Sequence, residues 1–160
     1  AAVALALAAF GSAAFAANQA PQRYTSIAAG DGISTPDLAR NEALKQLSVA
    51  TYRTSSAEYG MMFSVLQSVT FAPGTEVGCG GTLYEAYTYP EHAVIYICPR
   101  FYTSKSRYGI GYAAAVILHE AAHQVGIATE CEAERVVNDI RIQNDLHRVP
   151  SGYDAECGRI

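Results

Sequence analysis

Two histidines and a glutamate lie at a spacing that suits metal-assisted chemistry. They are His119, Glu120 and His123, in the sequence His-Glu-Ala-Ala-His. Residues four apart share one face of a helix, so both imidazoles can reach the same metal ion. Glu120 lies about 100° further round such a helix. Its carboxylate is therefore expected beside the open position of the metal, where a general base for a bound water belongs.

The residues around this motif predict the helix that it needs. Residues 109–124 read GIGYAAAVILHEAAHQ, an apolar run without proline, and Gly126 stands where a helix would end. The alternative interpretation is a core helix whose two histidines are satisfied by hydrogen bonds. Core packing gives no reason for Glu120 among apolar neighbours, which favours the metal site.

A catalytic zinc site needs a third protein ligand, and the residues after the motif offer several acids. Thr129 followed by Glu132 is a capping-box pattern, which predicts a new helix and gives Glu132 a structural role. We expect Glu130 to be the third ligand and Glu134, four residues later, to orient the free ring N–H of a histidine. Glu132, Glu134 and His147 are the alternative ligands. Acids also favour a helix N-terminus through its dipole, without any metal.

The first half of the chain predicts a helical scaffold. A helix is expected to start at Thr35-Pro36-Asp37, with Thr35 as its cap and the proline in its first turn. A second helix is expected over residues 56–67, although Gly60 disfavours it. We identify no chemistry in residues 35–67.

The middle of the chain predicts a small antiparallel sheet. A first strand is expected at residues 69–71, followed by a hairpin with strands at 82–89 and 93–98, which are rich in aromatic and β-branched side chains. Residues 100–107 are polar and basic, and we expect a loop there. The predicted fold class is therefore α+β, with the metal-binding helix and a ligand-bearing helix after the sheet.

The N-terminal residues resemble an export signal. Residues 1–16 form an apolar, alanine-rich run that ends in Ala14-Phe15-Ala16, an A-x-A pattern. The run is short for a membrane span, which needs about 20 residues, although an anchoring helix is an alternative. We expect cleavage near Ala16 or Ala20 and a single domain over residues 17–160.

Four cysteines predict two disulfides in an oxidising compartment, so the chain is expected to be secreted or periplasmic. Three pairings are possible. We favour Cys79–Cys98 and Cys131–Cys157, because each pair closes a local loop. A cysteine-based metal site is the competing interpretation, but the chain has no CxxC motif.

The charge of the chain disfavours nucleic acid as a partner. The formal net charge is −4, and no basic run occurs. Outside residues 1–16, no stretch is apolar enough to predict a membrane span, so no membrane partner is expected for the mature form.

The motifs resemble those of the zincin metallopeptidases. The HExxH motif, a short connection and then Glu130-Cys131-Glu132-Ala133-Glu134 are similar to the arrangement in small single-domain gluzincins. In that group a Glu on the next helix is the third ligand, and an acid four residues later supports a histidine. The usual second acid is Asp, whereas this chain has Glu134.

A weaker likeness is to the deuterolysin-like aspzincins. In that family a strand with a cysteine and an aromatic pair precedes the HExxH helix, as residues 95–102 do here. The Gly-Thr-x-Asp signature of the family is missing, and Ala128-Thr129-Glu130-Cys131 stands in its place. The two likenesses together cover about residues 94–137.

The resemblance implies a zincin-like fold and a secreted zinc-dependent endopeptidase that acts on a protein or peptide. Zn²⁺ would be held by His119, His123 and Glu130, with Glu120 as the general base. An edge strand above the helix would hold the substrate extended, and the hairpin that ends at Cys98 is the candidate. Candidates for stabilising the oxyanion are Tyr108, Tyr112, Tyr153 and His147.

Two other functions are compatible with the same residues. A metal-dependent amidase that acts on cell-wall peptides would use identical ligands. A metal-free binding module held together by its disulfides would use none of them.

Overall fold

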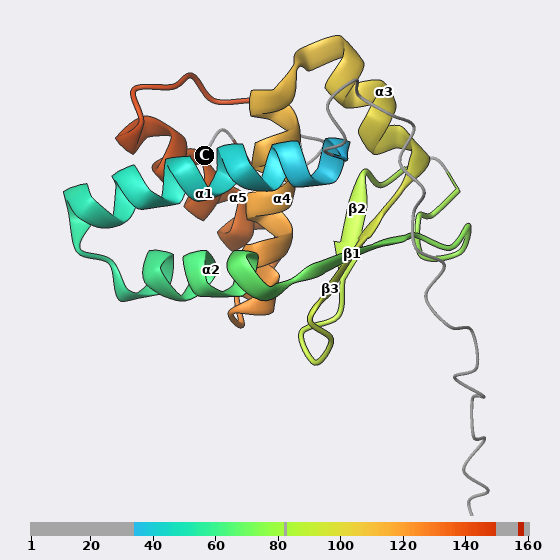
Figure 1. The fold of residues 1–160 in the computed structure, drawn as a ribbon, viewed down its shortest axis with the longest axis horizontal. Helices are drawn as coiled ribbons and strands as arrows, with labels where there is room; N and C mark the ends of the chain where they lie inside the picture. Colours follow the sequence, from blue (N-terminus) through green and yellow to red (C-terminus); the bar gives the residue numbers. More distant parts are fainter. Residues whose placement is uncertain (1–33, 82, 150–156, 159–160) are drawn as a thin grey trace, which may run out of the picture.

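The computed structural model describes residues 34–149, except residue 82, together with residues 157 and 158. The expected signal peptide (residues 1–16) and Tyr153 lie outside the described residues. The elements, in chain order, are α1 (Thr35–Thr54), α2 (Ala57–Ser68), β1 (Thr70–Pro73), β2 (Ala86–Thr88), β3 (Val94–Ile97), α3 (Pro99–Tyr108), α4 (Ile110–Gln124) and α5 (Glu130–Gln143). This arrangement confirms the α+β class (Figure 1).

The two N-terminal helices begin at serine caps. Ser34, not Thr35, is the cap of α1: its Oγ accepts a hydrogen bond from the backbone N of Asp37, and Thr35 is already helical. Ser56 caps α2 in the same way, through the backbone N of Tyr59. Both predicted helices are confirmed, and Gly60 does not interrupt the second.

The sheet is mixed, which corrects the prediction of a wholly antiparallel one. Its strand order is β1-β3-β2, with β2 antiparallel to β3 but β1 parallel to β3. The chain leaves β1 at Pro73, opposite Ile97, and returns through residues 74–85 to start β2 at that same end. β2 therefore runs opposite to β1, and β3, which is antiparallel to β2, has the direction of β1. Because β3 inserts between the other two strands, it pairs with β1 in parallel. The predicted hairpin is confirmed as β2 and β3, but β2 has only three residues.

Residues 100–107 form most of helix α3, so the prediction of a loop there is wrong. Pro99 occupies the first turn after Cys98, where its missing N–H costs nothing. Phe101 and Ser104, three residues apart, are the buried face, and Lys105 and Arg107 favour the last turn through the helix dipole. The apolar face is narrow, which is why the sequence looks like a polar loop.

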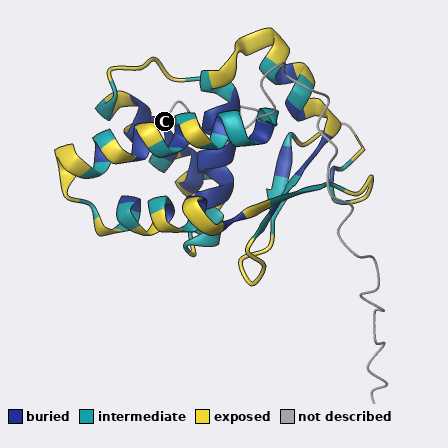
Figure 2. Ribbon diagram, viewed as in Figure 1, coloured by how far each residue is buried: buried dark blue, intermediate teal, exposed yellow. Residues whose placement is uncertain are grey.

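Helix α4 lies at the centre of the described fold. It packs against α1, α2, α3, α5 and strand β2. Its buried positions are mostly small, which lets neighbouring backbones approach closely: Ala113, Ala114, Ala115, Ala121 and Ala122, with Ile117 and Leu118. Figure 2 shows the buried residues concentrated on this helix. The HExxH motif is thus held on the most enclosed element.

Both predicted disulfides are present. Cys79–Cys98 joins the loop between β1 and β2 to the start of α3, and Cys131–Cys157 joins the first turn of α5 to the C-terminal segment. Two disulfides are typical of proteins in an oxidising environment. None of the helices in the described part of the chain is long and apolar enough to cross a membrane.

Candidate metal centre

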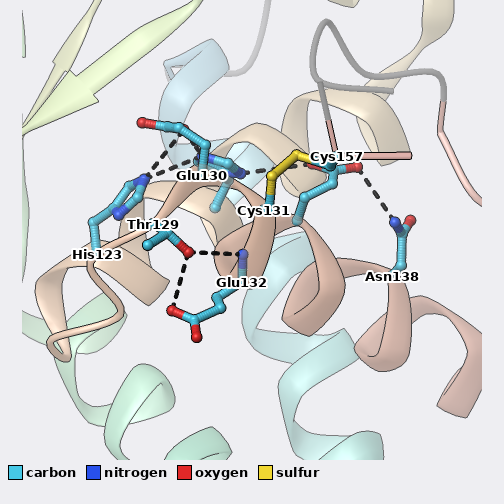
Figure 3. The surroundings of a disulfide bond; sticks show 9 residues. His123, Thr129, Glu130, Cys131, Glu132, Asn138 and Cys157 are labelled. Carbon is cyan, nitrogen blue, oxygen red and sulfur yellow. Dashed lines mark hydrogen bonds and ion pairs between the residues drawn. A yellow bond between two sulfur atoms is a disulfide. The ribbon is translucent and has the colours of Figure 1, made fainter. Parts of the chain in front are cut away.

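Three side chains from two helices converge on one point. His119 and His123 come from α4, and Glu130 comes from the first turn of α5. His119 Nε2 is 2.8 Å from Glu130 Oε2 and 3.1 Å from His123 Nε2, and the third side of the triangle, from His123 Nε2 to Glu130 Oε2, measures 3.5 Å. Figure 3 shows His123 and Glu130 pointing toward one another from these two helices.

The size of this triangle fits a tetrahedral metal ion. Two ligand atoms at about 2.0–2.2 Å from such an ion lie roughly 3.3 Å apart. The three measured separations lie on either side of that value. His119, His123 and Glu130 could therefore hold a metal ion, each through one ligand atom.

The backbone beyond α4 fixes the orientation of His123. Its Nδ1 lies 2.7 Å from the carbonyl oxygen of Ile127. Gly126 makes this contact possible, because its φ of 97° turns the chain back after the helix and few other residues adopt that conformation. When Nδ1 donates to this carbonyl, Nε2 carries the lone pair that faces the cluster.

Glu134 takes the corresponding place beside His119. Its Oε2 is 3.6 Å from Nδ1 of His119, and both side chains are buried. Burial by itself lowers the pKa of His119, but the hydrogen bonds to Glu130 and Glu134 and the charge of Glu120 outweigh it and raise the pKa to about 9. His119 in the metal-free chain is thus held as a cation by surrounding carboxylates.

Glu120 is buried on the same helix. Burial raises its pKa from 4.5 to about 7; the charge of His119 opposes this shift and the charge of Glu130 adds to it. A carboxyl group with a pKa in this range can both accept and return a proton near neutral pH.

The start of α5 separates the roles of its acidic residues. Thr129 Oγ1 accepts a hydrogen bond from the backbone N of Glu132 and donates one to its carboxylate, as Figure 3 shows. Glu132 is therefore part of the helix cap, and Glu130 is the acid that lies in the cluster with His119 and His123. His147 is exposed, and its carbonyl accepts a hydrogen bond from Arg141. None of the three alternative ligands, Glu132, Glu134 and His147, is in the cluster found among the described residues.

Strand β2 is an edge of the sheet and lies against α4. Cys98 donates its backbone N–H to the carbonyl of Glu85, so in this antiparallel register Ala86 and Thr88 direct their backbone groups away from β3. The strand that ends at Cys98, β3, is instead central. Of the predicted hairpin, only β2 can therefore offer an edge.

Two features near the site were missed from the sequence. Gln124 Nε2 donates to the carbonyls of Tyr89 and His92 and to the hydroxyl of Thr88, which ties the hairpin to the end of α4. Asn138 Nδ2 donates to Glu134 Oε1. The spacing of four residues from Glu134 is a signal that could have identified Asn138.

Of the tyrosines named for the oxyanion, Tyr112 lies in the first turn of α4 and Tyr108 is the last residue of α3. Tyr112 donates its hydroxyl to Glu85 Oε1 at 3.1 Å, and its pKa is raised by burial and by the charge of Glu85. Tyr108 is half exposed, and its ring lies against that of Tyr112. The described contacts of these two side chains do not include the histidine cluster.

Comparison with known proteins provides no further guide to this site. No protein-family model, no curated protein and no solved structure matches the chain.

Proposed function

We propose that this chain is a zinc-dependent endopeptidase. The observation that carries the proposal is the triangle of His119, His123 and Glu130, with Glu120 buried on the same helix. Two imidazoles and one carboxylate are a ligand set typical of catalytic zinc, and three protein ligands leave a position for water. The fold we propose to be zincin-like on the same grounds.

The residues of the chain divide the chemistry between them. Bound zinc would lower the pKa of a water and polarise the carbonyl of the substrate. Glu120 would accept the proton of that water and return it to the leaving amine, which its raised pKa favours. Ile127 and Glu134 would keep the two imidazoles turned toward the metal.

The sheet edge supports a peptide as the substrate. The outward backbone groups of Ala86 and Thr88 could pair with an extended chain, which would add one more strand beside β2, on the side away from β3. Such pairing recognises main chain rather than one side chain. The two disulfides support a secreted or periplasmic site of action.

The test is hydrolysis of an unfolded protein by the zinc-loaded chain and by two isosteric variants. Glu120→Gln should lower kcat at least about a hundredfold, because the general base is lost. Glu132→Gln is the matched control and should keep the rate, because Glu132 belongs to the cap. Equal cleavage by Glu120→Gln and the parent would refute the proposal. Cleavage of cell-wall peptides but not of proteins would instead identify an amidase with the same site.

A further inference from the structure

Asn138 is a buried polar residue whose side-chain amide contacts the carboxylate of Glu134. Its side chain is buried in α5, one helical turn after Glu134. Its Nδ2 lies 3.4 Å from Glu134 Oε1, and its Oδ1 has no hydrogen-bond partner among the residues that the structure describes. In Figure 3 a dashed line from the labelled Asn138 amide marks this hydrogen bond.

Stability alone does not favour an asparagine at this position. A buried, unpartnered carbonyl oxygen costs about 1–3 kcal/mol, and an apolar side chain of similar shape would avoid that cost. What Asn138 adds is one N–H donor for Glu134, which is itself buried. A buried carboxylate needs such donors to stay charged and fixed in one orientation.

The donor acts on the oxygen of Glu134 that the metal centre does not use. Glu134 presents Oε1 to Asn138 and Oε2 to Nδ1 of His119. Fixing Oε1 therefore fixes the direction in which Oε2 faces the histidine. A chain of contacts therefore runs from Asn138 to Glu134, one turn apart on α5, and from Glu134 to His119 on α4.

We infer that Asn138 is a positioning residue of the metal centre: it orients Glu134, and Glu134 orients His119 as a ligand. This inference rests on the proposed function, since it assumes that His119 binds a metal. It adds a residue that contacts neither the metal nor a substrate, and it predicts that metal affinity depends on Asn138 through Glu134 alone.

The experiment is a double-mutant cycle on zinc affinity, measured by competition with a chelator. Asn138→Leu and Glu134→Gln should each weaken zinc binding on the order of tenfold. The double variant should be no weaker than Glu134→Gln, because Asn138 then has no carboxylate to orient. Additive losses would show that Asn138 acts independently of Glu134 and would overturn the inference.

Asn144→Leu is the matched control for the loss of an asparagine amide. Asn144, just after α5, donates to the backbone carbonyls of Gln46 and Ile140, and to no side chain within the described part of the chain. This variant should lower stability toward urea and leave zinc affinity at the parental value. Asn138→Leu should instead weaken zinc binding without lowering stability toward urea. An equal loss of zinc affinity in both would make Asn138 merely structural.

Zinc binding by the parent chain and by Glu130→Ala distinguishes a failure of the proposed function from a failure of the role of Asn138. If the parent binds zinc, Glu130→Ala loses it and Asn138→Leu retains parental affinity, the proposed function stands and the role of Asn138 is refuted. If the parent binds no zinc, both fail together.

Discussion

Glu120 occupies an environment that an ordinary helix carboxylate does not. It is buried, it lies beside His119 in the chain, and its pKa is raised above the usual range by burial. The same residue is the one that core packing could not explain from the sequence. At the scale of single residues, the site consists of a buried acid beside a cationic histidine, with the pKa of Glu120 raised to about 7 and that of His119 raised to about 9.

A pH-dependent cost of burying Glu120 follows for the metal-free chain. Its folded pKa of about 7 exceeds its unfolded value of 4.5, so its contribution to stability is full below pH 4.5 and is lost as pH rises toward 7. From pH 4.5 to about 6 the loss should be about 2 kcal/mol, since one pKa unit corresponds to about 1.4 kcal/mol. His119 stays largely protonated in both states over this range and does not contribute.

Urea unfolding in the presence of a chelator measures this effect. The free energy of unfolding of Glu120→Gln, relative to the parent, should increase from pH 4.5 to about 6, because glutamine carries no titrating proton. A difference that is independent of pH would contradict the burial of an acid with a raised pKa.

At the scale of elements, the features that were predicted correctly from the sequence are those that depend on the spacing of nearby residues. The helix of the HExxH motif, the capping box at Thr129 and the hairpin were all correct, because each follows from local periodicity or local hydrogen bonding. Helix α3 was missed because Phe101 and Ser104 are its only buried residues. The parallel pairing of β1 was missed because it depends on where β3 inserts, which no local pattern encodes.

Gln124, at the end of α4, links this helix to the hairpin. Gln124 holds β2 and its turn through three acceptors, on Thr88, Tyr89 and His92. Gln124→Ala should raise the KM for a peptide by up to about tenfold, the value of one net hydrogen bond or slightly more, with zinc affinity unchanged.

Steady-state kinetics beside zinc titration checks this assignment. Gln67→Ala is the control, since Gln67 is exposed near the end of α2 and should alter neither quantity. A loss of zinc affinity in Gln124→Ala, at an unchanged KM, would mean that the hairpin does not hold the substrate.

At the scale of the whole molecule, two disulfides fix two separate parts of the fold. Cys79–Cys98 closes the loop that leads into β2, and Cys131–Cys157 lies next to Glu130 in the first turn of α5 (Figure 3). The sequence predicted both pairings, since each closes a loop of moderate length. Their different positions predict different consequences of removing them.

Removing either disulfide should lower the free energy of unfolding by about 3 kcal/mol, the cost expected for loops of this length. Only the Cys131→Ala/Cys157→Ala variant should also weaken zinc binding, because it loosens the turn that carries Glu130. Urea unfolding and zinc competition on both double variants test this difference. Equal zinc affinity in the two variants would show that the Cys131–Cys157 disulfide does not contribute to the metal site.

The most direct test of the central claim is the zinc content of the purified, oxidised chain beside that of Glu130→Ala. The proposed site predicts about one zinc per parent chain, bound at least tenfold more weakly in the variant, because even residues that only orient a ligand contribute about that much. Zinc that is unaffected by the variant would contradict Glu130 as the third ligand. A parent chain that takes up no zinc, even when zinc is added, would contradict the metallopeptidase itself.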